Sequence, residues 1–156
     1  MFVKGKLINS GLTFEKEYSV SFTFTASKFS SGWHNILHFT TGDDLGSPGS
    51  RIPAVWMHMS KGDEKAKPLL ICSDVSGKSN YCWTSKSIPV NTIIQIQIRQ
   101  IREGNSYIYQ ILIDGKVHHE VRNRQPRVFR DVKLYASDPW YAAQKGEINN
   151  LEYSKG

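Results

Sequence analysis

The chain has 156 residues, of which 39% are hydrophobic and 12% aromatic, and its composition excludes a disordered polymer. No apolar run approaches the roughly 20 residues of a membrane-spanning helix, and the length predicts one domain over residues 1–156. Twenty Lys and Arg residues against fourteen Asp and Glu residues give a net charge of +6, which favours anionic partners.

The first two predicted elements are strands. Phe2 to Leu7 is expected to form a short strand that ends at the turn-forming residues 9–11. From Tyr18 to Thr25, apolar and aromatic residues alternate with Ser and Thr at a strict period of two, which predicts a half-buried strand. The N-terminus lacks the apolar core of a signal peptide, so we expect either an intracellular protein or a mature secreted form.

The stretch from residue 32 to residue 59 predicts a binding site. Residues 32–41 carry bulky side chains on both faces, which predicts a central strand that needs cover on both sides. The next ten residues hold three glycines, Asp43, Asp44 and Pro48, a composition typical of a polar loop. Residues 52–59 are expected to return as the neighbouring strand, and a rigid strand pair that carries a polar loop commonly builds a binding site.

Two cysteines follow an exposed, charged connection predicted over residues 60–68. Cys72 and Cys82 flank a segment with Gly77 at its midpoint, and a hairpin there would face the two sulfur atoms across adjacent strands. A disulfide would then stabilise the fold by about 2–3 kcal/mol, and two reduced, buried thiols are the alternative. Zinc is disfavoured because the spacing is not C-x-x-C and no second ligand pair follows.

Residues 90–101 are expected to form a strand with three isoleucines on one face, and the hairpin after it has two alternatives. A two-residue Asp114-Gly115 loop would pair Ile111 with His118, which mixes core and solvent faces. A loop one residue longer pairs Ile111 with Val117, so we predict the three-residue loop. His119 then points inward and His118 outward, and this pair cannot chelate one metal ion from a regular strand.

The last part of the chain continues the pattern. Residues 129–136 are expected to form a strand, residues 137–141 a turn with two large aromatic side chains, and residues 146–153 a final strand. No helical period of useful length occurs, so the chain is predicted to be all-β with roughly ten or more short strands.

Five cations crowd one short segment around Gln125-Pro126. A solvated edge that discourages sheet-to-sheet aggregation is one interpretation. A patch that binds sulfated or sialylated glycans, or nucleic acid, is the other, and its binding would weaken with salt. The five residues are Arg122, Arg124, Arg127, Arg130 and Lys133.

Catalytic motifs are not evident. Glu15 and Glu17 form the only close pair of glutamates, at a strand entrance, and solvated charge explains them better than the paired carboxylates of a glycosidase. His38, on a strand with apolar neighbours, is expected to be a hydrogen-bonded core residue. Among the tryptophans, Trp140 lies in a turn and is the best candidate to stack on a sugar ring.

Four segments, taken together, resemble laminin-G-like domains of the concanavalin A-like lectin and glucanase superfamily, which occur in extracellular proteins of invertebrates. They are residues 33–42, 51–56, 71–82 and 132–141. The resemblance covers nearly the whole chain and implies a two-sheet antiparallel β-sandwich with a jelly-roll topology, a secreted setting and a Cys72–Cys82 bridge. Those domains usually carry an acidic residue where this chain has Ser50, which weakens the case for calcium held by Asp43 and Asp44.

These observations predict a non-catalytic, extracellular recognition module that binds glycans or glycosylated partners, anionic ones included, through loops at the rim. A structural or adhesive protein that forms homo-oligomers is the alternative, and a polysaccharide hydrolase would require two cleft carboxylates that the sequence does not display. We expect no cofactor, no nucleic acid partner and a secreted location, with the cytoplasm as the alternative. The residues expected to contact the ligand are Asp43, Asp44, Arg51, His58, Asp138, Trp140 and Tyr141.

Overall fold

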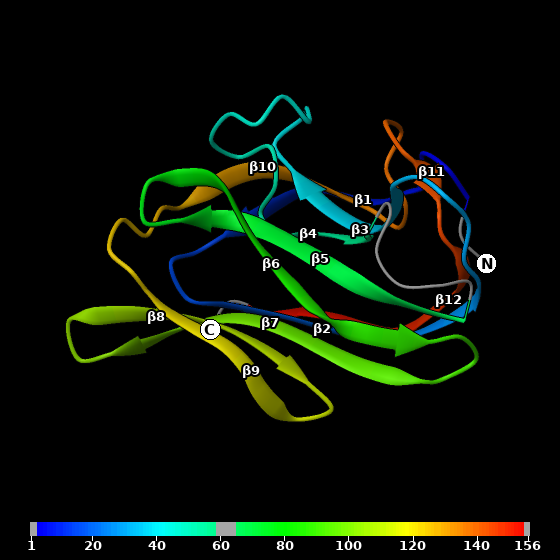
Figure 1. Cartoon of the computed structure of the whole chain (residues 1–156). Coiled ribbons are helices and arrows are strands. Elements are labelled where there is room, and N and C mark those ends of the chain that lie inside the picture. Colours follow the sequence, from blue (N-terminus) through cyan, green and yellow to red (C-terminus); the bar gives the residue numbers. More distant parts are fainter. Residues whose placement is uncertain (1–2, 59–64, 155–156) are drawn as a thin grey trace.

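The computed structural model describes residues 3–58 and 65–154, which form two antiparallel sheets packed face to face (Figure 1). The larger sheet consists, in spatial order, of β1 (Leu7–Phe14), β10 (Phe129–Tyr135), β3 (His34–Thr40), β4 (Ala54–Met57), β5 (Ala66–Val75) and β6 (Lys78–Pro89), with β11 (Ala142–Ala143) parallel to β3. The smaller sheet consists of β12 (Lys145–Ser154), β2 (Tyr18–Lys28), β7 (Ile94–Glu103), β8 (Ser106–Ile113) and β9 (Lys116–Asn123). This architecture confirms the predicted all-β sandwich.

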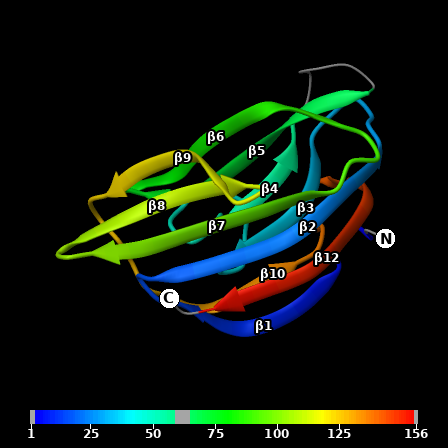
Figure 2. The ribbon, with the colours of Figure 1, turned by 90° about the horizontal axis from the view of Figure 1, so that it is seen from below.

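The core lies between the two sheets. On β2 the burial alternates residue by residue, so that Val20, Phe22 and Phe24 face inward while the Ser and Thr residues face outward, as predicted. The isoleucines at positions 94, 96 and 98 of β7 share the same inner face. Figure 2, seen from below, shows the smaller sheet in front of the larger one.

The predicted central strand is β3, which lies between β10 and β4 in the larger sheet. Six of its seven residues are buried, because the inner face meets the core and the outer face is covered as well. The cover comes from the loop of residues 41–53 and the turn of residues 136–141, which both rise above the outer face of the larger sheet in Figure 1. These two connections frame the site described below.

The first strand differs from the prediction, whose starting residue Phe2 lies outside the described residues. β1 begins at Leu7 and continues through Asn9 and Gly11 to Phe14. The pairing with β10 shifts register between Asn9 and Leu12, and Gly11 has a φ of 68°. The glycine therefore accommodates a bulge within the strand instead of ending it.

The β8–β9 hairpin also corrects the prediction. Its loop has two residues, because Ile113 pairs with Lys116 and Leu112 with Val117. The next pair joins Ile111 to His119, so His118 is an extra residue in β9. This β-bulge restores the alternation that a regular two-residue hairpin would have lost, and His118 is exposed while His119 points inward, as expected.

Two further boundaries were misplaced. The charged connection predicted over residues 60–68 lies partly outside the described residues, and its last part belongs to β5. There Lys67 is buried, and its Nζ donates a hydrogen bond to the Ser30 carbonyl oxygen at 3.0 Å. The strand predicted from Val90 begins at Ile94, because Asn91 adopts a φ of 56° in a turn.

The two cysteines form a disulfide, which confirms the hairpin interpretation. Cys72 on β5 pairs directly with Cys82 on β6, and the chain reverses at Ser76 and Gly77, where both residues have positive φ. Adjacent strands are therefore linked covalently as well as by their backbone hydrogen bonds.

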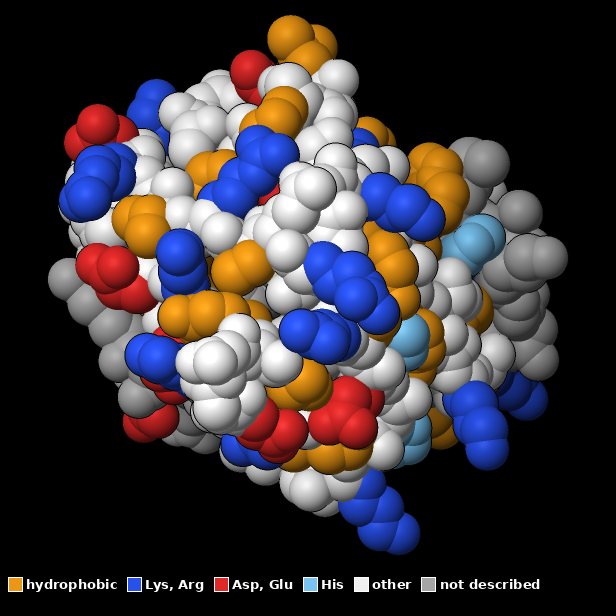
Figure 3. Space-filling view, turned by 90° about the vertical axis from the view of Figure 1, so that its left-hand side faces the viewer, with side chains coloured by type: hydrophobic (Ala, Val, Ile, Leu, Met, Phe, Trp, Pro, Cys, Tyr) orange, Lys and Arg blue, Asp and Glu red, His pale blue; other side chains and the backbone are white. Residues whose placement is uncertain are grey.

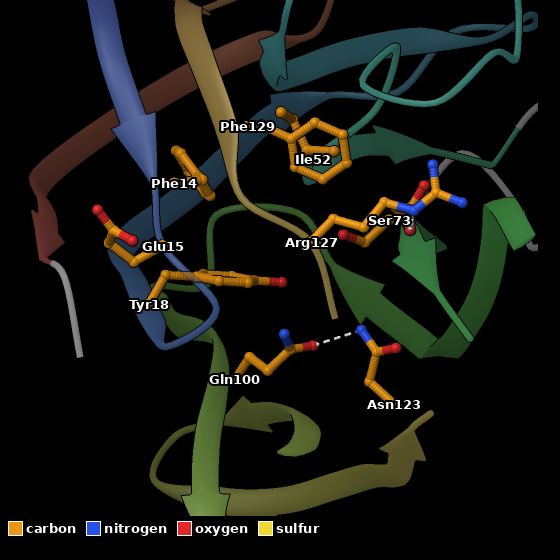
Figure 4. A pocket seen from close by; sticks show the side chains of 10 residues that line it. Phe14, Glu15, Tyr18, Ile52, Ser73, Gln100, Asn123, Arg127 and Phe129 are labelled. Carbon is orange, nitrogen blue, oxygen red and sulfur yellow. Dashed lines mark hydrogen bonds and ion pairs between the residues drawn. The ribbon is translucent and has the colours of Figure 1, made fainter. Parts of the chain in front are cut away.

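A buried polar cluster closes one end of the sandwich around a cavity of about 10 Å³ (Figure 4). The Asn123 amide donates to Gln100 Oε1 at 2.8 Å, with the Tyr18 ring beside them. Asp74 lines the same cavity and is 6% exposed, and neither of its carboxylate oxygens has a hydrogen-bond partner in the described part of the chain. Burial raises the pKa of this carboxyl, although Arg127, whose Nε lies 4.0 Å away, opposes the shift.

Candidate functional site

A second apolar cluster lies on the outer face of the larger sheet, away from the core. Along β4, Val55 and Met57 face the core, so the alternating Ala54 and Trp56 face outward. Trp56 is 2% exposed because other groups cover it. The remaining members of this cluster are Cys72, Trp33, Leu70 and Tyr141.

Arg51 is the polar centre of this outer face. Its guanidinium lies 4.5 Å from the centroid of the Trp56 ring. Nε and Nη2 donate to the two carboxylate oxygens of Asp44 at 2.7 and 3.1 Å, Nη1 donates to Asn80 Oδ1 at 2.7 Å, and Nη2 donates to the Tyr141 hydroxyl at 3.2 Å. One side chain therefore ties the 41–53 loop, β6 and the 136–141 turn together.

The charge of Arg51 is balanced locally. Burial lowers the pKa of the guanidinium, but the hydrogen bond and the negative charge of Asp44 more than offset this, so the net shift is upward. Arg51 and Asp44 therefore remain an ion pair, and the pair adds no net charge to the site.

These residues border a hollow of about 300 Å³ on the outer face, which we call the aromatic groove. Three aromatic rings and one aliphatic side chain supply apolar surface, while the Arg51 guanidinium and the Asn80 amide supply polar groups. Its volume lies at the lower end of the range for small-molecule sites. The lining residues are Trp33, Arg51, Trp56, Leu70, Asn80, Cys82 and Tyr141.

Beside the groove, His38 and Asp138 form a fully buried pair. His38 Nδ1 lies 2.6 Å from Asp138 Oδ2, and His38 Nε2 lies 2.7 Å from the Ser50 carbonyl oxygen. Carboxylate and carbonyl oxygens are hydrogen-bond acceptors, so each ring nitrogen faces an oxygen of another segment. His38 thus pins the 41–53 loop to the 136–141 turn, and both of its nitrogens are engaged.

Asp138 also organises its own turn. Its second oxygen, Oδ1, accepts from the backbone N–H groups of Trp140 and Tyr141 at 3.1 and 2.8 Å. The Asp138 N–H donates to Asn35 Oδ1 on β3 at 2.9 Å. The position of the Tyr141 ring in the groove therefore depends on this buried carboxylate.

The structure brings some of the predicted site residues together. One connected hydrogen-bond network joins Asp44, Arg51, Asp138 and Tyr141. Asp44 and Asp138 do not line the groove, but they hold Arg51 and Tyr141, which do. Asp43 accepts from the Ser50 hydroxyl and the Leu45 N–H, and these bonds lower the pKa of its carboxyl.

The other two predicted residues lie outside the lining. Trp140 is 39% exposed on its turn, 5.3 Å from the His38 ring, and the His58 ring lies 4.7 Å from that of Trp33. Sequence reasoning did not assign Trp33, Trp56 or Asn80 to the site. The available signal was the alternation in residues 54–57, which places Trp56 on the face opposite Val55.

The predicted basic patch divides into three parts. Arg122 and Arg124 border a separate hollow near the end of β9, Arg127 lies beside Asp74, and Arg130 and Lys133 belong to β10. Figure 3 shows Lys and Arg side chains spread over this end of the molecule, with Asp and Glu side chains among them.

A metal site has no support in the part of the chain that is described. No group of three or more His, Cys, Asp or Glu residues is placed to hold an ion there, and the carboxylates of Asp43 and Asp44 already bind Ser50 and Arg51. Calcium prefers six to eight oxygen ligands, which this arrangement does not offer. Within residues 3–58 and 65–154, no helix is long and apolar enough to cross a membrane.

No protein-family model and no curated protein sequence matches the chain. Domain 4 of an extracellular arabinanase from Geobacillus stearothermophilus, solved with arabinotriose, superposes with a TM-score of 0.58 and 14% identity, covering 99% of this chain and 69% of that one. An alginate lyase from Alteromonas sp. 272 superposes with a TM-score of 0.55 and 8% identity, covering 92% of this chain and 74% of the lyase. The CBM40 domain of a Ruminococcus gnavus sialidase, bound to α2,3-sialyllactose, superposes with a TM-score of 0.51 and 10% identity, covering 97% of this chain and 89% of that domain.

At these identities the similarity concerns the fold, which is a jelly-roll β-sandwich. Membership of the laminin-G-like domains stays a prediction, because no family model matches.

Proposed function

We propose that this protein is a non-catalytic carbohydrate-binding domain whose ligand lies in the aromatic groove. The observation that carries the proposal is the lining of the groove, where Trp33, Trp56 and Tyr141 surround the Arg51 guanidinium and the Asn80 amide. Aromatic rings pack against the apolar faces of sugars, and neighbouring polar groups take up hydroxyl groups. Two of the structurally similar domains were solved with bound sugars, which is consistent with this use of the fold.

The groove favours uncharged sugar residues. Both oxygens of Asp44 accept from Arg51, so the guanidinium does not present an unbalanced positive charge to the ligand. An acidic sugar would have to compete with Asp44 for the same donors. We therefore place neutral glycans, free or attached to glycoproteins, first among the ligands of the groove.

A hydrolytic role has less support. None of the seven side chains that line the groove is a carboxylate, whereas glycoside hydrolysis generally uses a pair of them. Turnover of alginate, arabinan or another polysaccharide by the purified protein would overturn the non-catalytic part of the proposal. We also propose a secreted location, since the disulfide suits an oxidising compartment.

The proposal is tested by a glycan array, followed by affinity measurements for the best glycan with two tryptophan variants. Trp33→Ala removes a groove wall and is expected to weaken binding about tenfold. Trp140→Ala removes a more exposed indole outside the lining and is expected to change the affinity less than about twofold. Absence of binding to every glycan, or equal losses in the two variants, would contradict the proposal.

Self-association is the second candidate function, and β1 is the observation that favours it. This strand forms an edge of the larger sheet, and its Leu7 and Ile8 side chains are each 47% exposed. An apolar, unpaired edge is a template for pairing with a second copy. Sedimentation over a range of concentrations tests this: a concentration-dependent mass supports it, and a monomer at all concentrations contradicts it.

A further inference from the structure

We propose a second binding site, independent of the aromatic groove, in which Arg122 and Arg124 bind the anionic substituents of an acidic polysaccharide. The two arginines border a hollow of about 300 Å³ between the end of β9 and the β7–β8 turn. Asn105, Ser106 and Tyr107 form the other side, and Asn123 and Pro126 complete the lining. No acidic side chain is part of it.

The two guanidinium groups are available. Neither Arg122 nor Arg124 forms an ion pair with any residue in the described ranges, whereas Arg51 and Arg127 each have an acidic neighbour. The nearest acid along β9 is Glu120, two residues before Arg122, which accepts from the Gln110 amide and does not line the hollow. Two unpaired arginines in one concave surface create a local positive potential.

The backbone that carries them is fixed. The Ser76 hydroxyl donates to the Arg122 carbonyl at 3.0 Å and accepts from the Arg124 N–H at 2.9 Å. Between them, Asn123 Oδ1 accepts from the Ser76 and Gln125 N–H groups at 2.9 and 3.0 Å. The segment is therefore held against the β5–β6 turn, and the two arginines two residues apart project from a preformed support.

The chemistry of the lining indicates the ligand. Guanidinium groups bind the oxygens of sulfate esters and carboxylates through paired, charge-assisted hydrogen bonds, and the hydroxyl and amide groups opposite them suit sugar hydroxyls. Tyr107 is the single aromatic side chain of the lining, so a run of nucleic acid bases would find no stacking platform. An acidic polysaccharide fits better than a nucleic acid.

The test measures binding of four probes to the full chain at low ionic strength: dextran sulfate, polygalacturonate, uncharged dextran and a single-stranded oligonucleotide. We expect binding to one or both acidic polysaccharides that weakens with added salt, and none to uncharged dextran through this site. Dextran sulfate and polygalacturonate distinguish a sulfate ester from a carboxylate. Failure to bind both acidic polysaccharides, or tighter binding of the oligonucleotide, would overturn the proposal.

Two matched double variants distinguish binding at this site from general attraction by the net positive charge of the protein. Arg122→Gln/Arg124→Gln should weaken acidic polysaccharide binding about tenfold or more, while the contacts to Ser76 persist because they involve the backbone. Arg130→Gln/Lys133→Gln removes the same charge from β10 and should change the affinity for acidic polysaccharides less than about twofold. Equal losses would show general electrostatic attraction and overturn the site. Trp33→Ala should weaken the binding of a neutral glycan to the groove and leave the binding of acidic polysaccharides unchanged. Either proposal can therefore fail while the other stands.

Discussion

The guanidinium of Arg51 lies 4.5 Å from the centroid of the Trp56 ring, so the polar centre of the groove rests directly on its aromatic floor. Two further constraints hold it there, the bidentate pair with Asp44 and the bond to Asn80. The groove therefore has a fixed shape before any ligand arrives, which lowers the entropic cost of binding.

Replacing Arg51 by lysine tests this arrangement. Arg51→Lys keeps the charge but loses the paired bond to Asp44 and the planar stack on Trp56, so we expect a loss of about 1–3 kcal/mol in the free energy of unfolding and weaker glycan binding. Urea denaturation measures the first effect. Arg130→Lys, at an exposed position, is the control and should change stability by less than about 0.5 kcal/mol. Equal stability of the two variants would refute the proposed role.

The buried pair of His38 and Asp138 gives a second prediction. Asp138→Asn replaces a carboxylate that lies 2.6 Å from His38 Nδ1 and accepts from two backbone N–H groups in a site with no solvent access, so we expect a loss of about 3 kcal/mol or more in the free energy of unfolding. Asp131→Asn is the matched control, since Asp131 is exposed and asparagine tolerates its φ of 54°. Chemical denaturation of both variants decides, and a loss below about 1 kcal/mol for Asp138→Asn would contradict the account.

The pH dependence of stability tests the environment of Asp74. Burial raises the pKa of its carboxyl, so the folded protein binds this proton more tightly than the unfolded chain does. Stability should therefore fall as the pH rises from the ordinary aspartate pKa of about 4 through the raised value. Asp74→Asn should remove this dependence and be more stable than wild type by about 1 kcal/mol at neutral pH. A less stable variant at neutral pH would show that the attraction to Arg127 outweighs burial.

Reduction of the disulfide should affect both the fold and the groove. The bridge spans a sequence separation of 10, and opening it should lower the free energy of unfolding by about 2–3 kcal/mol. Cys82 lines the groove two residues from Asn80, so the affinity for a neutral glycan should fall as well. Denaturation and binding with and without a thiol-free phosphine reductant measure this, and unchanged values for both would contradict it.

Most of the fold could be predicted from the alternation of apolar and polar side chains along the strands. The period-two pattern from Tyr18 and the isoleucines after Val90 placed β2 and β7 with their correct inner faces. Two of the errors occurred where one residue breaks the period. Gly11 accommodates a bulge inside β1, and His118 is an extra residue in β9. A local bulge leaves little mark in composition, because the partner strand decides whether it forms.

The site was predictable only in part. The polar loop and the aromatic turn indicated Arg51 and Tyr141, whose side chains do meet. Asn80 contacts the same guanidinium from β6, a neighbour that only the three-dimensional arrangement of the strands reveals. Among the tryptophans the sequence favoured Trp140, whereas Trp56 lines the groove as a buried side chain on the outer face of its sheet.

The most direct test of the groove uses the four tryptophans as reporters, since each indole N–H gives its own signal in a proton–nitrogen NMR spectrum. Trp33 and Trp56 line the groove, Trp83 stacks 5.8 Å from His119, and Trp140 lies on the turn. On titration with the glycan selected by the array, the account predicts that the Trp33 signal moves most, that Trp56 follows and that Trp83 stays in place. Saturable binding that shifts Trp83 or Trp140 and leaves Trp33 unmoved would contradict it.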